Sequence, residues 1–489
     1  MTTAPLFSYA IGPLHFIGIG GIGMSGIAEI LHNLGYTIQG SDLSENGNVR
    51  RLRTLGITIC VGHAPDNLQT SAGHFPACVV VSSAVQANNP ELIAARQRNI
   101  PIVRRADMLA ELMRLKQGIA VGGTHGKTTT TSMIATLLEQ AGLDPTVING
   151  GIVQAYGTNT RLGQGDWVVA EADESDGSFN SLPATIAIIT NIDPEHMEHY
   201  GSFDAVKRAY LHFAEKIPFY GAAIMCIDHP EVKALHAQIR DRRTLTYGLG
   251  DAAMVRAVNL RPRVDGTMFD VTFTALSGSD AETVQDIFLP VLGQHNIQNA
   301  LAALAVARLL KISGAVMRTA FAGFAGVKRR FTCTGIVSGI TIIDDYGHHP
   351  VEIKAALAAA RQGTDAQGGR VIAVMQPHRY SRLEGLFGDF CACFDGADHV
   401  IIADVYAAGE TPIADINKLT LADGIAAHGH ASVQALTSPE ELPAVIHAMA
   451  RSGDFILFLG AGTITQWANA LPAQLEEMNR GWQSHKNQV

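Results

Sequence analysis

The chain alternates short apolar runs with amphipathic segments along most of its length. Apolar runs such as Leu14–Ile19, Trp167–Ala170 and Val371–Met375 have the continuous hydrophobicity of strands that are buried on both faces. Segments between such runs, for example Arg104–Leu115, repeat apolar residues at helical spacing. Because strands that alternate with helices form parallel sheets, the pattern predicts an α/β protein.

The length of 489 residues corresponds to about three domains of ~150 residues each. We predict a Rossmann-like N-terminal domain over residues 1–115, a central domain over 116–325 and a Rossmann-like α/β C-terminal domain over 326–489. Alternation at Phe269, Val271 and Phe273, just after Asp265-Gly266, indicates a β-hairpin. The central domain is therefore expected to carry a small antiparallel sheet.

Bulk composition excludes several classes of protein. A net charge of −9 gives no basic face, so we expect no nucleic-acid partner. The six cysteines are scattered, which favours reduced thiols over a zinc site or a disulfide framework. The N-terminus lacks a cleavable signal, and no apolar run is long enough to span a bilayer. We therefore expect a cytoplasmic protein with no membrane insertion.

The stretch Val121–Thr131, VGGTHGKTTTT, predicts a phosphate site. Its glycines let backbone amides approach a ligand, Lys127 adds a positive charge, and Thr128 opens a helix with a hydroxyl suited to a phosphate-bound magnesium. A tight turn capped by threonine is the alternative, but it leaves the lysine unexplained. The spacing is one residue shorter than in the general nucleotide loop. The residues assigned to the bound phosphate here are Gly122, Gly123, Thr124, His125, Gly126, Lys127 and Thr128.

Two later strands end in candidate metal ligands, the second of which is also a candidate phosphate contact. Glu171 follows Trp167–Ala170 within EADESD, and His196 follows Thr185–Thr190 within DPEHM. Carboxyl ends of parallel strands share one edge of a sheet, so both side chains are expected near Lys127. An acidic run is otherwise a solvated face, and a loop histidine is otherwise a hydrogen-bonding residue. His199 is a weaker candidate for the same role.

The N-terminal segment carries a dinucleotide fingerprint, Gly18-x-Gly20-x-x-Gly23, with Asp42 nineteen residues later. Alone, it predicts a nucleotide-dependent oxidoreductase, although a glycine-lined helix start holds any diphosphate, and a turn that binds nothing is the remaining alternative. Ser82 and Ser83 end another strand and are either ligand contacts or the cap of the next helix.

Two further pairs have residues three apart on one predicted helical face. Asn296 and Asn299 can read an adenine edge, whereas N-capping by Asn296 explains only one of them. Arg379 and Arg382 can clamp a carboxylate, unless they are surface arginines or part of a salt-bridged turn.

Together, these motifs closely resemble the Mur ligase family, and the resemblance covers nearly the whole chain. In chain order they are HFIGIGGIGMSGIAE, SD, VSSAV, GGTHGKTTTT, EADESD, DPEHM, HNIQNA, RRF, DDYGHHP and QPHRYSR. The resemblance implies a P-loop-type central ATPase domain and ligation of L-alanine to the lactyl carboxylate of UDP-N-acetylmuramate through an acyl phosphate. It also implies ATP and Mg2+ or Mn2+ as cofactors. Alternatives are a recycling ligase that attaches a tripeptide to the same sugar and, less favoured, a dinucleotide-dependent oxidoreductase.

The resemblance also implies roles for individual residues. Lys127 would neutralise the γ-phosphate, Thr128 and Glu171 would hold one metal ion, and His196 would hold a second. The UDP-sugar would contact Gly18, Gly20, Gly21, Gly23, Asp42, Ser82 and Ser83. Further ATP contacts would be Asn296, Asn299, Arg330 and Asp345. The amino acid would contact Tyr346, His348, Arg379 and Arg382. The residues expected to act directly in catalysis are Lys127, Glu171, His196, His348 and Arg379.

Overall fold

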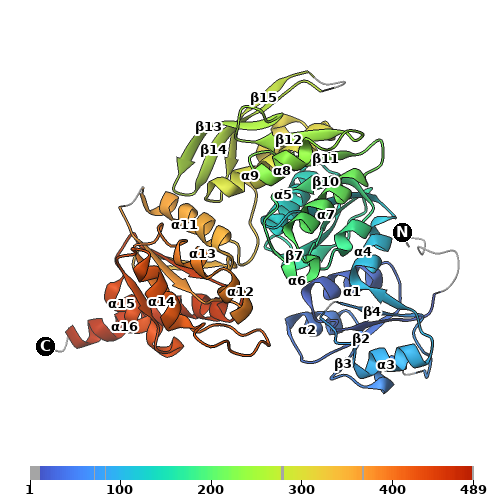
Figure 1. Ribbon diagram of the computed structural model, residues 1–489, viewed down its shortest axis with the longest axis horizontal. Coiled ribbons are helices and arrows are strands. Elements are labelled where there is room, and N and C mark those ends of the chain that lie inside the picture. The colour runs from blue at the N-terminus through green and yellow to red at the C-terminus, as the bar shows by residue number, and fades with distance from the viewer. Residues whose placement is uncertain (1–10, 71, 83, 277–279, 366–367, 487–489) are drawn as a thin grey trace. The chain divides into compact units, whose positions relative to one another are not determined.

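The computed structural model describes residues 11–486 except 71, 83, 277–279 and 366–367, so Ser83 lies outside the described residues (Figure 1). The chain divides into two compact units. The first holds the described residues of Met1–Val258, Val271–Val284 and Gln298–Ala325, and the second those of Asn259–Asp270, Gln285–Ile297 and Gly326–Val489. Three separate sheets form the framework of the fold.

The first sheet is five-stranded and parallel, in the order β3-β2-β1-β4-β5. Its strands are β1 (Leu14–Ile17), β2 (Ile38–Asp42), β3 (Thr58–Val61), β4 (Cys78–Val81) and β5 (Ile102–Arg104). Its helices are α1 (Ile22–Asn33), α2 (Gly47–Thr54), α3 (Pro90–Gln97) and α4 (Arg105–Met113). This is the predicted Rossmann-like arrangement. β1 ends two residues earlier than expected because Gly18 has φ +75° and turns the chain.

The second sheet is ten-stranded, in the order β15-β14-β13-β12-β11-β10-β6-β9-β7-β8. Its first seven strands in chain order are β6 (Gln117–Gly122), β7 (Thr146–Val153), β8 (Thr158–Arg161), β9 (Trp167–Glu171), β10 (Ala184–Ile189), β11 (Ala222–Cys226) and β12 (Thr244–Gly248). The predicted hairpin is β13 (Val255–Arg263) and β14 (Gly266–Phe273), followed by β15 (Glu282–Leu289). These strands extend the main sheet, because β13 pairs with β12.

The helices that follow the strands of this sheet include the one predicted after the phosphate loop. They are α5 (Lys127–Gln140), α6 (Met197–Tyr200), α7 (Phe203–Glu215), α8 (Pro230–His236), α9 (Gln294–Leu309) and α10 (Gly314–Ala322). β6 lies between β9 and β10 and is parallel to both. The sequence motifs at the ends of these three strands therefore share one edge of the sheet.

The third sheet has six strands in the order β16-β17-β21-β18-β19-β20, antiparallel only between β16 and β17. Its strands are β16 (Thr332–Val337), β17 (Ile340–Asp345), β18 (Val371–Met375), β19 (His399–Ile402), β20 (Val433–Ala435) and β21 (Phe455–Leu459). Its helices are α11 (Pro350–Asp365), α12 (Tyr380–Gly385), α13 (Phe387–Cys391), α14 (Lys418–Ala427), α15 (Leu442–Met449) and α16 (Ile464–Lys486).

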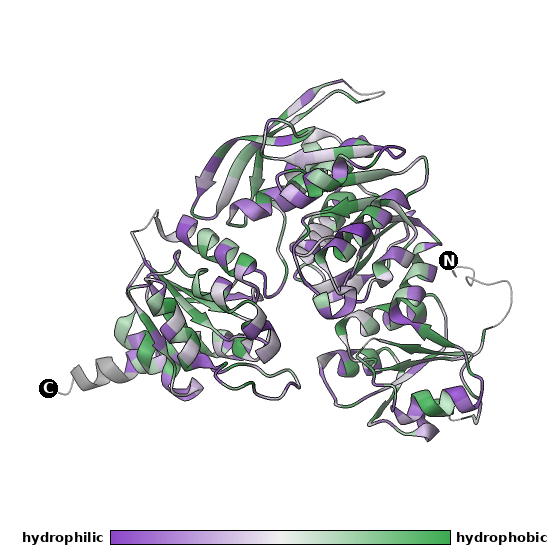
Figure 2. Ribbon diagram, in the orientation of Figure 1, coloured by the Kyte–Doolittle hydropathy of each residue, from purple (hydrophilic) through white to green (hydrophobic). Residues whose placement is uncertain are grey.

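Successive side chains of this sheet enter two different cores. Val371, Ala373 and Met375 pack with α11, α13 and α14, whereas Ile372 and Val374 pack with α15 and α16. The central strands β18 and β21 are accordingly apolar along their whole length, and hydrophobic green runs through the interior of this domain in Figure 2. This explains why continuous apolar runs predicted them correctly. None of the helices in the described part of the chain has the length and apolar composition needed to cross a membrane.

A buried carboxylate joins the elements of the N-terminal sheet. Glu91 of α3 is fully buried and accepts hydrogen bonds from His15 of β1 (2.8 Å) and Ser41 of β2 (2.7 Å). It also accepts one from Asn67 (2.7 Å), in the segment after β3. Burial opposes ionisation, but these hydrogen bonds outweigh it and lower the pKa of Glu91 to about 2.

We expect Glu91→Gln to remove a pH dependence of stability from this domain. A carboxyl whose pKa is lowered on folding stabilises the fold above its unfolded pKa, and that contribution disappears as the pH falls through the folded value. For Glu91 the window runs from about pH 4.5 to about pH 2 and spans about 3 kcal/mol. Urea unfolding across this range, with hydrogen exchange of β1 and β2 to identify the transition, measures it. Glu111→Gln, on an exposed side chain, should leave the wild-type slope unchanged.

Candidate active site around the Lys127 loop

The phosphate loop requires glycine at two positions. Gly123 has φ +134°, and a Cβ there would lie 1.9 Å from Thr190 Oγ1. Gly126 has φ +81°, and a Cβ there would lie 2.6 Å from Asn299 Oδ1. The loop thus combines left-handed backbone with close neighbours, which only glycine tolerates. The amides of Thr124 and His125 donate to Asn191, so the anion site that this loop offers is the start of α5.

The segment after β10 braces the loop from its side. Thr190 Oγ1 and Asn191 Nδ2 donate to the carbonyl of His125 (2.7 and 3.0 Å), and the His125 amide donates to Asn191 Oδ1 (2.7 Å). The Asp193 amide donates to Thr124 Oγ1 (2.9 Å). Thr124 and His125 are therefore fixed by the strand that also leads to His196.

Lys127 is enclosed by its own loop and by a carboxylate. Its Nζ donates to the carbonyls of Gly123 (2.6 Å) and Thr124 (3.1 Å) and to Glu174 (2.8 Å). Burial disfavours the ammonium charge, but the carboxylates of Glu174 and Glu171 outweigh it, and the pKa of Lys127 is raised. Lys127 therefore stays charged at neutral pH.

Thr128 and Glu171, which are predicted to share one metal ion, are in direct contact in the structure. Thr128 Oγ1 donates to Glu171 Oε2 at 2.9 Å, and the Gly150 amide donates to the same oxygen at 2.8 Å. Glu171 ends β9 and Thr128 opens α5, so the contact follows from the pairing of β6 with β9. A hydroxyl and a carboxylate at this distance are hard oxygen donors of the kind that Mg2+ prefers.

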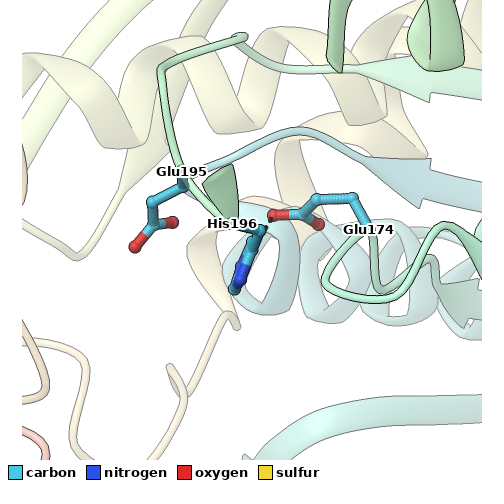
Figure 3. A group of neighbouring side chains, drawn as sticks. All are labelled: Glu174, Glu195 and His196. Atoms are coloured by element: carbon cyan, nitrogen blue, oxygen red, sulfur yellow. Dashed lines mark ion pairs between the residues drawn. The ribbon is translucent and has the colours of Figure 1, made fainter. Parts of the chain in front are cut away.

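His196 belongs to a second group of donors, drawn in Figure 3. One ligand atom each from Glu174, Glu195 and His196 can be chosen so that all three lie within 4.8 Å of one another. His196 Nε2 lies 3.9 Å from Glu174 Oε1, and the Glu174 carboxylate is turned toward the imidazole ring. His199 lies outside this group, with its ring against Tyr200 (4.8 Å between centroids). These donors could hold a metal ion.

In the N-terminal fingerprint, the acidic residue Asp42 is hydrogen-bonded to the glycine loop. Asp42 Oδ2 accepts from the Gly20 amide at 2.8 Å, and Asn48 Nδ2 donates to the Gly20 carbonyl at 2.9 Å. Gly18 turns the chain, and Gly21 precedes the start of α1. Glycine loop and acid are therefore neighbours, as predicted. The Ser82 carbonyl accepts a hydrogen bond from the Val85 amide (3.2 Å), and the role of Ser82 as a ligand contact remains a prediction.

The asparagines of α9 make distinct contacts. Asn299 Oδ1 accepts from Thr130 Oγ1 (3.1 Å) of α5. Asn296 Nδ2 donates to the carbonyl of Leu292 (2.7 Å). Because α9 begins at Gln294, Asn296 lies inside the first turn, so the alternative of N-capping by Asn296 is wrong. Reading of adenine by the two side chains stays a prediction.

The predicted amino-acid residues lie along a row of rings. We define the ring row as Tyr346, His348, His378 and Tyr406, whose successive centroids are 5.2, 5.7 and 5.5 Å apart. Arg379 precedes α12 with φ +69°, and its amide donates to the Tyr406 carbonyl (2.9 Å). Burial and the positive charges of His348, Arg382 and Arg379 lower the pKa of His378 to about 4.

Arg330 and Asp345 belong to the same part of the third sheet. Arg330 Nη1 lies 3.8 Å from Glu352 Oε1. Asp345 accepts from the amides of Gly347 and Phe331, each at 2.7 Å. Burial raises the pKa of Asp345 to about 6, although the Arg330 charge and these amides oppose the shift. Their contact with ATP stays a prediction.

Family models match the chain in three consecutive blocks. The Mur ligase family catalytic domain matches residues 13–117, the Mur ligase middle domain 121–307, and the Mur ligase glutamate ligase domain 329–462. The chain belongs to the Mur ligase family.

Individual relatives cover the chain from end to end. UDP-N-acetylmuramate–L-alanine ligase of Rhodospirillum rubrum is 58% identical over 95% of this chain and 95% of its own length. The ligase of the same name from Azorhizobium caulinodans is 58% identical over 96% of this chain and 99% of its own. Among solved structures, UDP-N-acetylmuramate-alanine ligase of Thermotoga maritima has a TM-score of 0.79 at 28% identity, covering 96% of this chain and 100% of its own. A murein peptide ligase of Psychrobacter arcticus has a TM-score of 0.67 at 25% identity, covering 95% and 98%.

Sequence reasoning missed three residues of this Mur ligase site. Glu174 and Glu195 lie within the recognised acidic motifs, but spacing does not tell which acid of a loop turns inward. Arg105, at the start of α4, lies against Gly23 of the fingerprint and pairs with Asp173 (3.0 Å). It joins the N-terminal loop to the acidic run, and no sequence pattern marked it.

We expect Gly126→Ala to weaken binding of a fluorescent ATP analogue by at least about tenfold, or ~1.4 kcal/mol, because the new Cβ collides with Asn299. Gly142→Ala is the matched control. Gly142 lies just beyond the other end of α5 with φ +73° and has open space around its Cβ position. Gly142→Ala introduces the same kind of backbone strain without a collision, so the affinity of this variant for the ATP analogue should stay within about twofold of wild type. Equal losses in the two variants would contradict the role assigned to the Asn299 contact.

Proposed function

We propose that this chain ligates L-alanine to the lactyl carboxylate of UDP-N-acetylmuramate and converts ATP to ADP and phosphate. The observation that carries the chemistry is the charged Lys127 in its glycine loop, beside the Thr128–Glu171 pair. The choice of substrates follows relatives that are named for them and are 58% identical over almost the full length. The murein peptide ligase is only 25% identical, which favours alanine over a preformed tripeptide.

The reaction has two steps. A carboxylate oxygen attacks the γ-phosphorus and the bond from phosphorus to the β–γ bridging oxygen breaks. ADP departs, and the sugar's carboxylate is now an acyl phosphate. The neutral amino nitrogen of alanine then attacks the acyl carbon, the bond to the phosphate oxygen breaks, and inorganic phosphate leaves as the amide forms. Attack by the neutral amine leaves the nitrogen positively charged, so it loses one proton to solvent or a nearby base to become the amide nitrogen. Catalysis of such transfers depends chiefly on positioning and charge stabilisation.

Lys127 is the principal cation for the first step. Its Nζ exchanges the carbonyls of Gly123 and Thr124 for oxygens of the γ-phosphate, while Glu174 keeps it charged. The amides at the start of α5 bind phosphate oxygens along the helix dipole. The bracing of His125 and Thr124 by the segment after β10 holds these donors in place before the nucleotide binds.

Two donor sets fit divalent cations. Thr128 and Glu171 would hold one ion, and Glu174, Glu195 and His196 would hold the other. Oxygen-rich donors suit Mg2+, and a set that includes imidazole also accommodates Mn2+. When bound, such ions neutralise phosphate charge and polarise the oxygens of the transferring group.

The remaining predicted contacts fall into three groups. The fingerprint with Asp42 and Ser82 binds the UDP-sugar through its diphosphate and ribose. Asn296, Asn299, Arg330 and Asp345 contact ATP. Tyr346, His348, Arg379 and Arg382 form the amino-acid pocket, where the guanidiniums bind the alanine carboxylate.

We expect phosphate release from ATP to require both UDP-N-acetylmuramate and L-alanine. A coupled phosphate assay with magnesium, in which each substrate is omitted in turn, measures this dependence. Release that needs the sugar and a tripeptide but not alanine would identify the recycling reaction instead. Release independent of any amino acid would refute the proposal.

Lys127→Ala should lower the alanine-dependent rate by at least about a thousandfold, because the transferring phosphoryl group loses its fixed cation. Circular dichroism and the UDP-sugar affinity should stay at wild-type values, since the fingerprint lies on a different sheet. Lys207→Ala is the control: this lysine is on α7 and pairs with Asp204 at the surface, so its rate should stay within about twofold. A Lys127→Ala enzyme that still turns over would contradict the assignment.

A further inference from the structure

Arg329 lies in the turn that precedes β16 and makes several contacts, but it has no role in the function proposed above. It precedes Arg330 in the RRF motif, has φ +62°, and its side chain is 21% exposed. Its Nη2 donates to the carbonyl of Gly460 (2.7 Å) and lies 3.4 Å from the carbonyl of Gly462. These carbonyls belong to the turn between β21 and α16.

The same guanidinium faces a buried acid. Arg329 Nε lies 3.8 Å from Oδ2 of Asp344, whose side chain is 3% exposed. The contact with Arg329 is an ion pair, and the same oxygen accepts a hydrogen bond from Thr465 Oγ1 in the first turn of α16. An unpaired buried carboxylate is costly, so Asp344 and the turn together fix the guanidinium in one orientation.

Arg329 also holds Tyr346 in two ways. The Tyr346 amide donates to the Arg329 carbonyl (2.8 Å), and the guanidinium carbon lies 4.8 Å from the centroid of the tyrosine ring. Tyr346 is the first member of the ring row. Because Arg329 contacts Tyr346 in both ways, its orientation constrains the position of Tyr346, one of the side chains predicted to surround the amino acid.

A flat guanidinium with five N–H donors can donate to the carbonyls of the turn, pair with the Asp344 carboxylate and lie over the Tyr346 ring at the same time. A lysine ammonium is a point charge and cannot satisfy all three. Arg330 is directed elsewhere, toward Glu352, although its guanidinium carbon also lies 5.0 Å from the Tyr346 centroid. The two arginines are therefore not equivalent.

We propose that Arg329 is a positioning residue that fixes Tyr346 against the turn Gly460–Thr463 and thereby limits which amino acid the pocket accepts. The inference rests on the proposed function, in which this pocket binds L-alanine. Arg329 acts through Tyr346 and does not itself touch the substrate.

Arg329→Met tests the proposal, because methionine retains apolar volume but has no donors. We expect the KM for L-alanine to rise at least about tenfold and the preference for alanine over serine, as a ratio of kcat/KM, to fall at least about fivefold. The KM values for ATP and UDP-N-acetylmuramate should stay within about twofold. An unchanged alanine KM and an unchanged preference would overturn the proposal.

Arg370→Met is a matched control in the same sheet. Arg370 is 23% exposed, pairs with Asp454 (2.6 Å) and donates to the carbonyl of Met449 (2.6 Å). It precedes β18, at the opposite end of the strands from Tyr346. This variant loses a comparable buried arginine, but its alanine KM and its preference for alanine should equal those of wild type. Equal effects in both variants would show a general loss of stability and overturn the proposal.

Arg329→Lys decides the matter if the methionine variant does not fold. It retains the charge beside Asp344 but not the planar donors, so the fold should persist while selectivity for alanine decreases. Wild-type selectivity in Arg329→Lys would overturn the proposal. Wild-type enzyme that releases no phosphate in response to alanine would refute the proposed function, whereas altered selectivity confined to the Arg329 variants supports the positioning role.

Discussion

The charge on Lys127 is the constraint on which the central site depends. An ammonium taken out of water costs several kcal/mol unless carboxylates surround it. Those carboxylates come from the last residue of β9 and the loop after it, and β9 is the strand paired with β6 on one side. The segment after β10, on the other side, supplies the residues that fix the loop backbone. The strand order around β6 is thus inseparable from the chemistry of the loop.

The three sheets use one architectural rule for different ligands. In each, parallel strands bring polar turns to their carboxyl edge: Gly18–Gly23 with Asp42 in the first, the Lys127 loop in the second, and Asp345 with the turn after β21 in the third. The rule explains how one chain without a basic overall charge could present the proposed sites for a diphosphate, a triphosphate and a carboxylate.

This rule also sets what sequence alone predicts. Apolar runs mark where strands end, so the sequence by itself predicts that Thr128, Glu171 and His196 lie near one another. It does not single out Glu174, because this residue lies within a loop whose path decides which acids turn inward. Nor does it single out Arg329, since the direction of this side chain depends on a positive φ that a run of basic residues does not reveal. The motifs therefore mark the correct loops, including that of His196 with φ +57°, but they do not tell which of several acids or arginines within a loop makes the inward contacts.

The hydrogen bond between Asp42 and the Gly20 amide has a consequence for selectivity. In the free chain, this carboxylate is a tethered competitor for a donor that an incoming diphosphate would use, and tethering gives it a high effective concentration. A small inorganic anion must displace the Asp42 carboxylate from the Gly20 amide, and it offers Asp42 no hydrogen-bond donor in exchange. A nucleotide whose ribose hydroxyl donates to Asp42 restores that bond as it binds. If the loop binds the UDP-sugar as proposed, this hydrogen bond would favour a ligand that brings both an anion and a hydroxyl group over bare phosphate.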